Sequence, residues 1–288
     1  MTDIQIITDS NCDIPKEMAQ ELGIEIVPIH VVVDGVEYEE SVSFTPVEYY
    51  DILAHASSLP QTSQITSYEF QKRFENAYQS GKEAVICITM TSVGSSIYQN
   101  AIRARRDFYE ECDGSRAFDI YVIDSKNYSI SYGYAAIRAA QKQREGASLE
   151  EILFAATDWI EHLETYFTVF SLEYISKSGR ISHAASIIGD TLGMRPLIQN
   201  INGSFEMVRK VRGNHAVVKA VSEMFRNRKM EDTDYVILQG TMPEMAQELA
   251  QQAELIAGKP PVGIFYSGPT ITTNTGPKNT GIGFMAKK

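Results

Sequence analysis

Hydrophobic and polar positions follow a regular order along the first half of the chain. Short apolar runs end in small polar residues, as in IQIITDS (4–10), EAVICITM (83–90) and IYVIDS (120–125). Each run is followed by a segment whose apolar residues recur at helical spacing. We therefore predict strands at these runs that alternate with helices, an order typical of a parallel sheet with helical crossovers.

Helix and turn signals between the runs agree with this order. The helix predicted after the second strand has one apolar face, made by Ile97, Ala101, Ala104, Phe108 and Cys112. Thr66 and Glu69 have the spacing of a capping box, and Asp13 is expected to cap the helix that follows it. Asp34-Gly35, between two apolar runs, predicts a β-hairpin.

The second half of the chain has a different order of elements. The predicted elements are helices at 149–163 and 183–193, strands at 165–170, 234–240 and 262–268, and a hairpin whose turn is Asn202-Gly203. The Gly-, Thr- and Pro-rich tail (268–284) receives no regular element. We therefore predict an α/β fold with two domains. Residues 1–158 form a mostly parallel sheet flanked by helices, and residues 159–288 form an α/β domain with a mixed sheet.

Composition narrows the class of function. The 288 residues carry a formal net charge of −11, which argues against a nucleic-acid groove and against binding to an anionic membrane surface. The three cysteines are widely spaced and the five histidines form no HExxH motif, so we expect neither a disulfide framework nor a metal site. No apolar stretch is long enough to span a membrane, and MTDIQIITDS lacks the features of a signal peptide. These features predict a cytoplasmic protein.

Polar residues at the strand ends supply the candidate chemistry. The segments TDS (8–10), TMTSVGSS (89–96) and IDSKN (123–127) each follow a predicted strand. Open α/β sheets bind ligands in the loops beyond the carboxyl ends of their strands. We therefore expect the three segments to lie together at one edge of the sheet.

TMTSVGSS has three possible uses that do not involve a carboxylate. A bound phosphate is disfavoured, because no P-loop pattern occurs and no lysine or arginine lies between Lys82 and Arg103. A serine nucleophile is disfavoured, because Tyr98 stands where the GxSxG elbow needs a small residue. Capping of the following helix by Ser95 or Ser96 is the simplest role.

The fourth use is binding of a singly charged carboxylate. Hydroxyl groups and helix N-terminal amides can hold such a group without a formal counter-charge. This use predicts a second hydroxyl-rich loop at the same edge of the sheet. QTSQIT (61–66) is such a loop, and Thr62 and Ser63 are its candidate ligands.

With these two loops identified, the chain resembles the DegV family, bacterial fatty-acid-binding proteins of the kind that serve fatty acid kinases. IITDSNCDIP (6–15), QTSQIT and TSVGSSIYQNA (91–101) are similar to the family's Thr-Asp-Ser turn, its Thr-Ser-Gln-Pro segment and its Ser-Gly-Thr-Tyr-Gln stretch. VIDSKN, EYISKSGRIS, GMRPLI and TTNTGPKNTG follow in the family's order. The resemblance covers essentially the whole chain.

The resemblance implies that two domains close around one long-chain fatty acid. Thr62 and Ser95 would hold the carboxylate, with help from Ser63 and from backbone amides near Ser96. The acyl chain would lie in an apolar tunnel, and for an acid of about C14–C18 its burial, at ~0.8 kcal/mol per CH₂, would dominate the affinity. The protein would be a carrier rather than an enzyme, with no cofactor and no metal. In family members that serve the kinase, the bound acid is presented for phosphorylation.

Some positions depart from the family pattern or lie outside these two loops. Ser96 replaces a family glycine, and Asn274 replaces a family histidine. Asn274 is expected near the carboxylate, where its amide can donate a hydrogen bond but cannot carry a proton. A role in serving a kinase is therefore left open. Arg180, in SKSGRIS, is expected to brace the pocket wall.

Two alternatives to a carrier are retained. A small-molecule phosphotransferase or a hydrolase would use Asp9 and Asp124, which end strands at the same edge, although hydrogen bonding to loop amides is their simpler role. The second alternative is an interaction module with an empty cleft. Lys210 and Arg212 are expected on an exposed strand edge, or else at a contact with a partner kinase.

Overall fold

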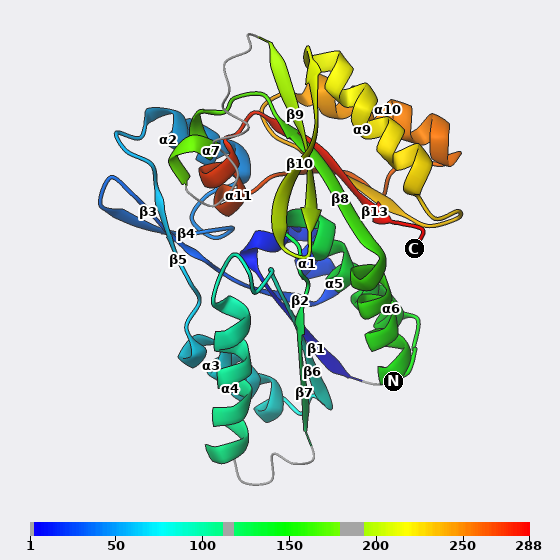
Figure 1. The fold of residues 1–288 in the computed structure, drawn as a ribbon. Coiled ribbons are helices and arrows are strands. Elements are labelled where there is room, and N and C mark those ends of the chain that lie inside the picture. The colour runs from blue at the N-terminus through cyan, green and yellow to red at the C-terminus, as the bar shows by residue number, and fades with distance from the viewer. Residues whose placement is uncertain (1–2, 112–117, 179–192) are drawn as a thin grey trace.

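The first of three sheets is the predicted parallel one. The computed structural model describes residues 3–111, 118–178 and 193–288 (Figure 1). Its four-stranded sheet has the order β2-β1-β6-β7, with all neighbours parallel. The strands are β1 (Ile4–Asp9), β2 (Ile24–Val27), β6 (Ala84–Thr89) and β7 (Asp119–Asp124). Every residue of β6 is buried, as expected of a central strand covered on both faces.

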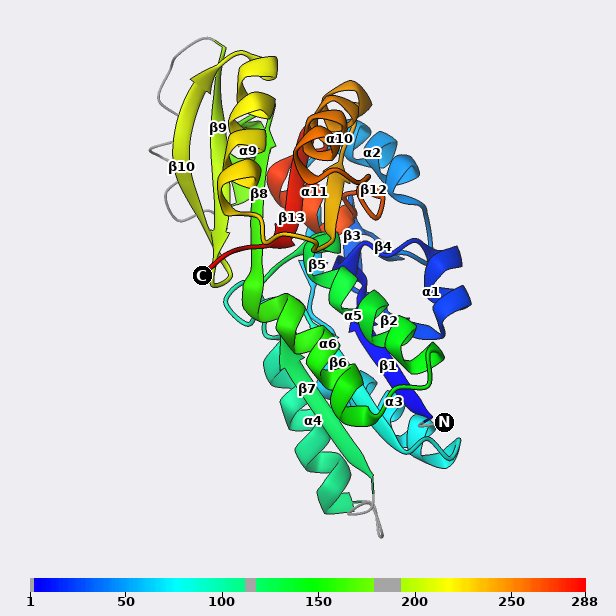
Figure 2. The same cartoon turned by 90° about the vertical axis from the view of Figure 1, so that its right-hand side faces the viewer.

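Helices cover both faces of this sheet. α3 (Ser67–Gln79) packs with α4 (Ile97–Glu111) on one face, and α5 (Ser129–Arg144) packs with α6 (Leu149–His162) on the other (Figure 2). α1 (Lys16–Leu22) lies beside α5 and ends at Gly23, as expected. The predicted apolar face of α4 is buried at Ile97, Ala101, Ala104 and Phe108, while Cys112 lies outside the described residues.

The second half of the chain forms a mixed six-stranded sheet. Its order is β10-β9-β8-β13-β11-β12, in which β11 and β12 are parallel and the other neighbours are antiparallel. The strands are β8 (Leu163–Val169), β9 (Met194–Ile201), β10 (Ser204–Arg212), β11 (Tyr235–Gln239), β12 (Ile264–Tyr266) and β13 (Asn279–Met285). α9 (Asn214–Arg228) and α10 (Pro243–Ala257) share a buried cluster with it. The expected hairpin has its turn at Asn202-Gly203, and Lys210 and Arg212 lie on the edge strand β10.

A third, three-stranded sheet lies at the side of the molecule (Figure 1). It pairs β3 (His30–Val33) with β4 (Val36–Glu39) through the predicted Asp34-Gly35 turn, and it pairs β3 with β5 (Gln61–Ser63). α2 (Pro46–His55) follows this hairpin and contacts α11 (Pro269–Thr275). The remaining described elements are the 3₁₀ helix η1 (Ser10–Cys12) and α7 (Glu173–Ser178).

One helix belongs to the cores of both large sheets. α5 is buried along almost its whole length and contacts β1 as well as β11 and β13. Its Gly133 lies so close to η1 that an added methyl group would be 2.2 Å from the carbonyl oxygen of Cys12. α6 packs into the first sheet's core and runs directly into β8, so the proposed domain boundary at 158/159 falls inside α6. That boundary remains a proposal.

Three expectations about elements differ from the structure or lie outside it. Asp13 does not cap the next helix, whose N-cap is Pro15. Asp13 instead has a left-handed backbone, and its carboxylate accepts a hydrogen bond from Ser129. The tail is not irregular, because it forms α11 and the fully buried strand β13. The helix predicted at 183–193 falls almost entirely outside the described residues. Within the described ranges, no helix is long and apolar enough to cross a membrane.

Candidate ligand-binding site

The polar ends of the parallel strands meet at one edge of the first sheet, as expected. Asp9, at the end of β1, accepts hydrogen bonds from the N–H of Met90 at 2.7 Å and from the Tyr132 hydroxyl at 2.7 Å. Asp124, at the end of β7, accepts from both the N–H and the hydroxyl of Ser92. The simpler of the two roles expected for Asp9 and Asp124, bonding to loop amides, is therefore confirmed.

The two hydroxyl-rich loops converge on one pocket of about 470 Å³, which we call the hydroxyl pocket. It is lined by Ile29, Thr62, Ser63, Gln64, Met90, Gly94, Ser95, Ser96, Ile97 and Thr270. None of these residues carries a charge. Thr62 and Ser63 come from β5, and Ser95 and Ser96 come from the loop before α4.

Ser95 has its hydroxyl proton available for a ligand. Its Oγ accepts a hydrogen bond from the N–H of Ile97 at 3.3 Å, which leaves the O–H free to donate. The Ser96 carbonyl accepts the first helical bond, from the N–H of Asn100 at 2.9 Å, so α4 begins at this point. The positive end of a 15-residue helix therefore faces the pocket, which favours an anionic group there.

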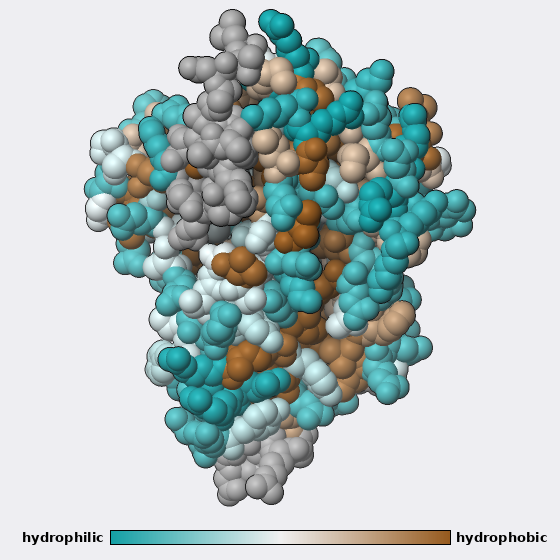
Figure 3. All heavy atoms as spheres, in the orientation of Figure 1, coloured by the Kyte–Doolittle hydropathy of each residue, from teal (hydrophilic) through white to brown (hydrophobic). Residues whose placement is uncertain are grey.

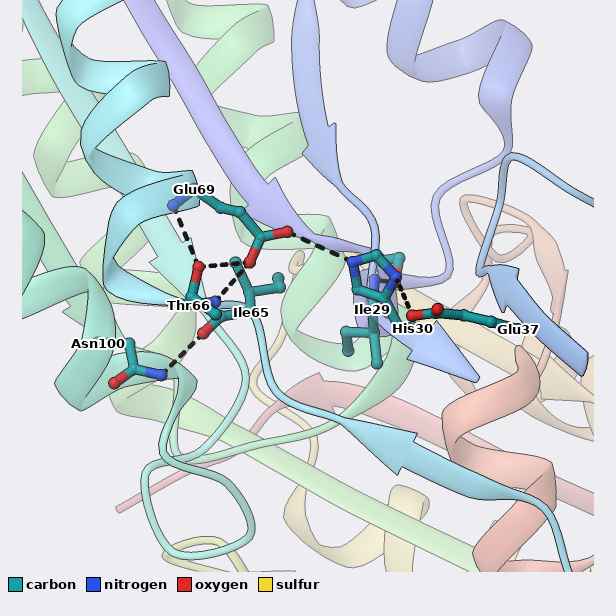
Figure 4. Close-up of polar contacts among 8 residues, drawn as sticks. Ile29, His30, Glu37, Ile65, Thr66, Glu69 and Asn100 are labelled. Carbon is teal, nitrogen blue, oxygen red and sulfur yellow. Dashed lines mark hydrogen bonds and ion pairs between the residues drawn. The ribbon is translucent and has the colours of Figure 1, made fainter. Parts of the chain in front are cut away.

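The segment that follows Thr62 and Ser63 is held by a carboxylate at the start of α3 (Figure 4). Glu69 closes the predicted capping box, accepting from the N–H of Thr66 at 2.7 Å and from its hydroxyl at 2.6 Å. Burial alone would raise the pKa of Glu69, but these bonds and a contact with His30 lower it. His30 lies on β3 directly opposite Ser63, and its ring is 3.4 Å from Glu69 and 3.1 Å from Glu37.

A side-chain amide joins the two hydroxyl-rich loops to each other. Asn100, on the first turn of α4, donates from Nδ2 to the carbonyl oxygen of Ile65 at 2.8 Å (Figure 4). Ile65 is fully buried, so this carbonyl lies where water cannot readily replace the bond. Asn100 therefore fixes the position of the Thr62 loop relative to Ser95.

The third side of the pocket comes from the C-terminal part of the chain. Thr270, in the first turn of α11, donates to the buried carboxylate of Glu40 from both its N–H and its hydroxyl, each at 2.8 Å. Glu40 also accepts from the Ser10 hydroxyl at 2.7 Å. Burial raises the pKa of Glu40, although these bonds oppose the rise. The Glu40 carboxylate thus ties α11 to the loop after β1.

Four of the predicted ligand residues are brought together, and two others are not placed with them. Thr62, Ser63, Ser95 and Ser96 line the same pocket. Asn274 is one turn farther along α11, where its amide donates to the carbonyl of Thr270 at 2.7 Å. Its expected contact with a headgroup stays a prediction, and Arg180 lies outside the described residues. Sequence reasoning missed Thr270, although its tail is conspicuously rich in threonine.

Apolar side chains gather on the other side of α11. A small cavity of about 30 Å³, which we call the apolar cavity, is lined by residues that include Tyr128, Thr165, Phe167, Phe205, Leu238 and Ile271. Phe167 also belongs to a buried cluster with Val169, Ile175 and Ile198, on β8, α7 and β9. In Figure 3, hydrophobic residues appear in brown along the middle of the face where the β9–β10 hairpin lies.

The hydroxyl pocket can hold a small anionic group close to the apolar cavity. The described acidic side chains around the pocket do not have the arrangement of a metal site. Among the residues that the structure describes, no three His, Cys, Asp or Glu side chains form a group that could hold a metal ion. The described lining of the hydroxyl pocket also offers no histidine to act as a base for Ser95.

Several known proteins are similar to this chain over all or nearly all of its length. A protein of Caldanaerobacter subterraneus with a DegV domain is 30% identical, and the alignment covers all of both chains. A solved DegV family protein from Thermus thermophilus, described as binding fatty acid, is 26% identical with a TM-score of 0.84, over 99% of this chain and all of that one. A stearic acid-binding protein from Eubacterium ventriosum is 24% identical with a TM-score of 0.85, over 99% and 98% of the two chains.

A family model gives the same result over nearly the same range. The model, described as the uncharacterised DegV family, matches residues 3–287. This range includes both large sheets and all the residues that line the hydroxyl pocket. The chain therefore belongs to the DegV family.

Proposed function

We propose that the protein binds one long-chain fatty acid, with its carboxylate in the hydroxyl pocket. Thr62 and Ser95 donate hydrogen bonds to the carboxylate, and the amides at the start of α4 add the field of the helix. The acyl chain runs past α11 to the apolar side chains between α7 and the six-stranded sheet. The protein makes and breaks no bond in the acid and acts as a carrier.

One observation carries this proposal, namely that the hydroxyl groups of two distant loops line one pocket whose described lining residues carry no charge. A multiply charged phosphate would leave much of its charge unpaired in such a place, because no lysine or arginine is among the described residues that line the pocket. A single carboxylate needs only a few donors. The solved relatives from T. thermophilus and E. ventriosum, described as binding fatty acid and stearic acid, support the same ligand class.

The rim of the pocket suits presentation of the bound acid to a second protein, such as a fatty acid kinase. Ser63, Gln64 and Ser96 are exposed to solvent, so a carboxylate between them can be reached from outside. Asn274 cannot move a proton, so the kinase would have to supply any acid–base step itself. Incubation of loaded protein with a fatty acid kinase and ATP, followed by trapping of the acyl phosphate with hydroxylamine, tests this role.

An enzyme on the same fold is the competing function. Asp9 and Asp124 are the candidate catalytic groups, and both carboxylates accept hydrogen bonds from neighbouring loops. A role in turnover would require these bonds to break. Hydrolysis of generic esters or phosphate esters by the purified protein would favour the enzyme.

Native mass spectrometry of the purified protein is the direct test of the carrier. We expect a co-purified acyl mass, and we expect the delipidated protein to bind one equivalent of an acid of about C14–C18, because burial of the chain dominates affinity. A protein that stays empty when offered these acids would contradict the proposal.

Replacing the hydroxyl groups tests which residues hold the carboxylate. Hydrogen bonds to a charged group contribute more than neutral ones, so Ser95→Ala and Thr62→Ala should each weaken palmitate binding about 10- to 100-fold. Binding of the fatty alcohol of the same length should change much less. Ser80→Ala, at an exposed residue that ends α3, is the matched control and should bind as the wild type does. Equal losses for acid and alcohol would assign both residues a purely structural role.

A further inference from the structure

The hydroxyl pocket and the apolar cavity are separated by the Tyr128 side chain and by the first turn of α11. Gly94 lines the first and Tyr128 lines the second, and a methyl group added at Gly94 would lie 2.3 Å from the Tyr128 hydroxyl oxygen. On α11, Thr270 lines the pocket and the next residue, Ile271, lines the cavity. Among the residues that the structure describes, Tyr128 therefore lies on the path of a ligand with its head in the pocket and its tail in the cavity.

Tyr128 is held in this position by the turn of the β9–β10 hairpin. Its hydroxyl donates to the carbonyl oxygen of Gly203 at 3.0 Å. Its ring packs on Phe205 with the centroids 4.6 Å apart, and Phe205 in turn meets the edge of Phe167 at 5.0 Å. The residue is the N-cap of α5, in extended conformation, and is only partly buried, so contacts with the hairpin help to position its side chain.

The same hairpin turn also rests on the loop that leads to Ser95. Gly203 has a left-handed backbone (φ 87°), and a methyl group there would lie 2.0 Å from the Thr91 hydroxyl oxygen. Asn200, just before the turn, donates to the carbonyl of Lys126 at 2.8 Å. The turn therefore bridges the loops after β6 and β7, and Tyr128 lies directly beneath it.

Because the apolar cavity is small, the position of the Tyr128 ring decides whether a long acyl chain can enter it. At about 30 Å³ the cavity has room for roughly two water molecules, far less than a long acyl chain occupies. Given the proposed function, on which this inference rests, we propose that Tyr128 is a specificity-determining residue. Its ring turns away from Gly94 to admit the acyl chain, and this movement breaks its bond to Gly203 and loosens the hairpin turn.

Two substitutions of Tyr128 test the roles of its hydroxyl group and of its ring separately. Tyr128→Phe keeps the ring but loses the bond to Gly203, so palmitate should associate about three- to tenfold faster in stopped-flow measurements, while its dissociation rate stays nearly unchanged because the bond is already broken in the bound state. Tyr128→Ala removes the wall, so the ratio of stearate to octanoate affinity should rise about tenfold, because more methylene groups are buried. Hydrogen exchange of residues 202–205 should increase when palmitate binds to the wild type.

Tyr109→Phe is the matched control, because the Tyr109 hydroxyl makes a similar bond to the Phe118 carbonyl at 2.9 Å on the far part of α4. It should leave palmitate kinetics and chain-length preference unchanged. If the wild type binds palmitate but Tyr128→Phe and Tyr128→Ala show its rate constants and chain-length preference, the inference is wrong and the proposed function stands. A wild type that binds no fatty acid would overturn the proposed function itself.

Discussion

Asn100 donates its side-chain amide to the carbonyl of Ile65, and so joins α4 to the loop that carries Thr62. This contact sets the spacing between Thr62 and Ser95, which the two hydroxyl groups cannot set by themselves. A carboxylate can accept from both only if that spacing is maintained. The residues that position the ligand groups therefore matter as much as those that touch the ligand.

Asn100→Ala should lower both stability and affinity. The buried Ile65 carbonyl would lose its partner, which costs about 1–3 kcal/mol of unfolding free energy, and palmitate binding should weaken because the loop loosens. Urea denaturation and a binding titration measure the two effects. Gln99→Ala, at the exposed neighbouring residue, should change stability by less than about 0.5 kcal/mol. Equal behaviour of the two variants would show that the bond to Ile65 contributes nothing.

The convergence of Thr62 and Ser95 could be predicted from the sequence, because both loops follow or precede elements with clear patterns. Thr270 could not be predicted. Its place in the pocket depends on Glu40, a residue 230 positions earlier, and on a buried hydrogen-bonded contact that leaves no periodic signal. Local patterns locate loops, whereas long-range contacts decide which loops meet.

At the scale of elements, β13 shows how tertiary packing overrides local preference. Its sequence, NTGIGFM, contains two glycines and an asparagine, which are uncommon in strands, yet every residue is buried between β8 and β11. Gly281 lies opposite Phe167, where a methyl group would be 2.7 Å from the Phe167 Cβ. The glycines are needed because neighbouring side chains and α5 occupy the space beside the strand.

Gly281→Ala should therefore destabilise the protein, although alanine is no worse than glycine in an ordinary strand. Forcing a methyl group into this contact should cost about 1–3 kcal/mol of unfolding free energy. Urea denaturation measures the loss. Lys278→Ala, at an exposed residue beside the strand, is the control and should leave stability nearly unchanged. An unchanged midpoint for Gly281→Ala would mean that β8 and β13 can separate without cost.

Strands with strong apolar runs and turns with Asp-Gly or Asn-Gly could be predicted from the sequence, as β6 and the two hairpins show. β13 and α11 could not, because a threonine-rich helix and a glycine-rich strand have weak propensities and form only in contact with the rest of the molecule. Asp13 had the residue type and spacing of a helix cap, but its carboxylate bonds Ser129 instead.

At the scale of the whole molecule, buried acidic groups bond to the two helices α5 and α11. Asp9 bonds Tyr132 of α5, Asp13 bonds Ser129, and Glu40 bonds Thr270 of α11. Burial raises the pKa of Asp9 to about 6. The pKa of Asp13 is raised well above its usual range by burial and by the charge of Glu40. These groups make the stability of the fold depend on pH.

The stability of the fold should fall as pH rises from about 4 to about 6. In this range the folded protein holds a proton on Asp9 that the unfolded chain has released, so for Asp9 the loss is at most about 3 kcal/mol. Above about pH 6 this contribution is constant. Chemical denaturation across this range checks the slope, which Asp9→Asn should reduce. An identical slope in Asp9→Asn would show that Asp9 does not titrate there.

β13 is central in its sheet but follows the sheet's other strands in the sequence, so it determines when that sheet can be completed during synthesis. The strands of the first sheet are complete once the ribosome has added residue 124, so that sheet can form early. β8 lies between β9 and β13, and it has no second partner until residues 279–285 have been made. Between the synthesis of β8 and that of β13, the nascent chain therefore exposes an unpaired strand edge beside a finished sheet, and chaperones would have the longest access to the molecule at that edge.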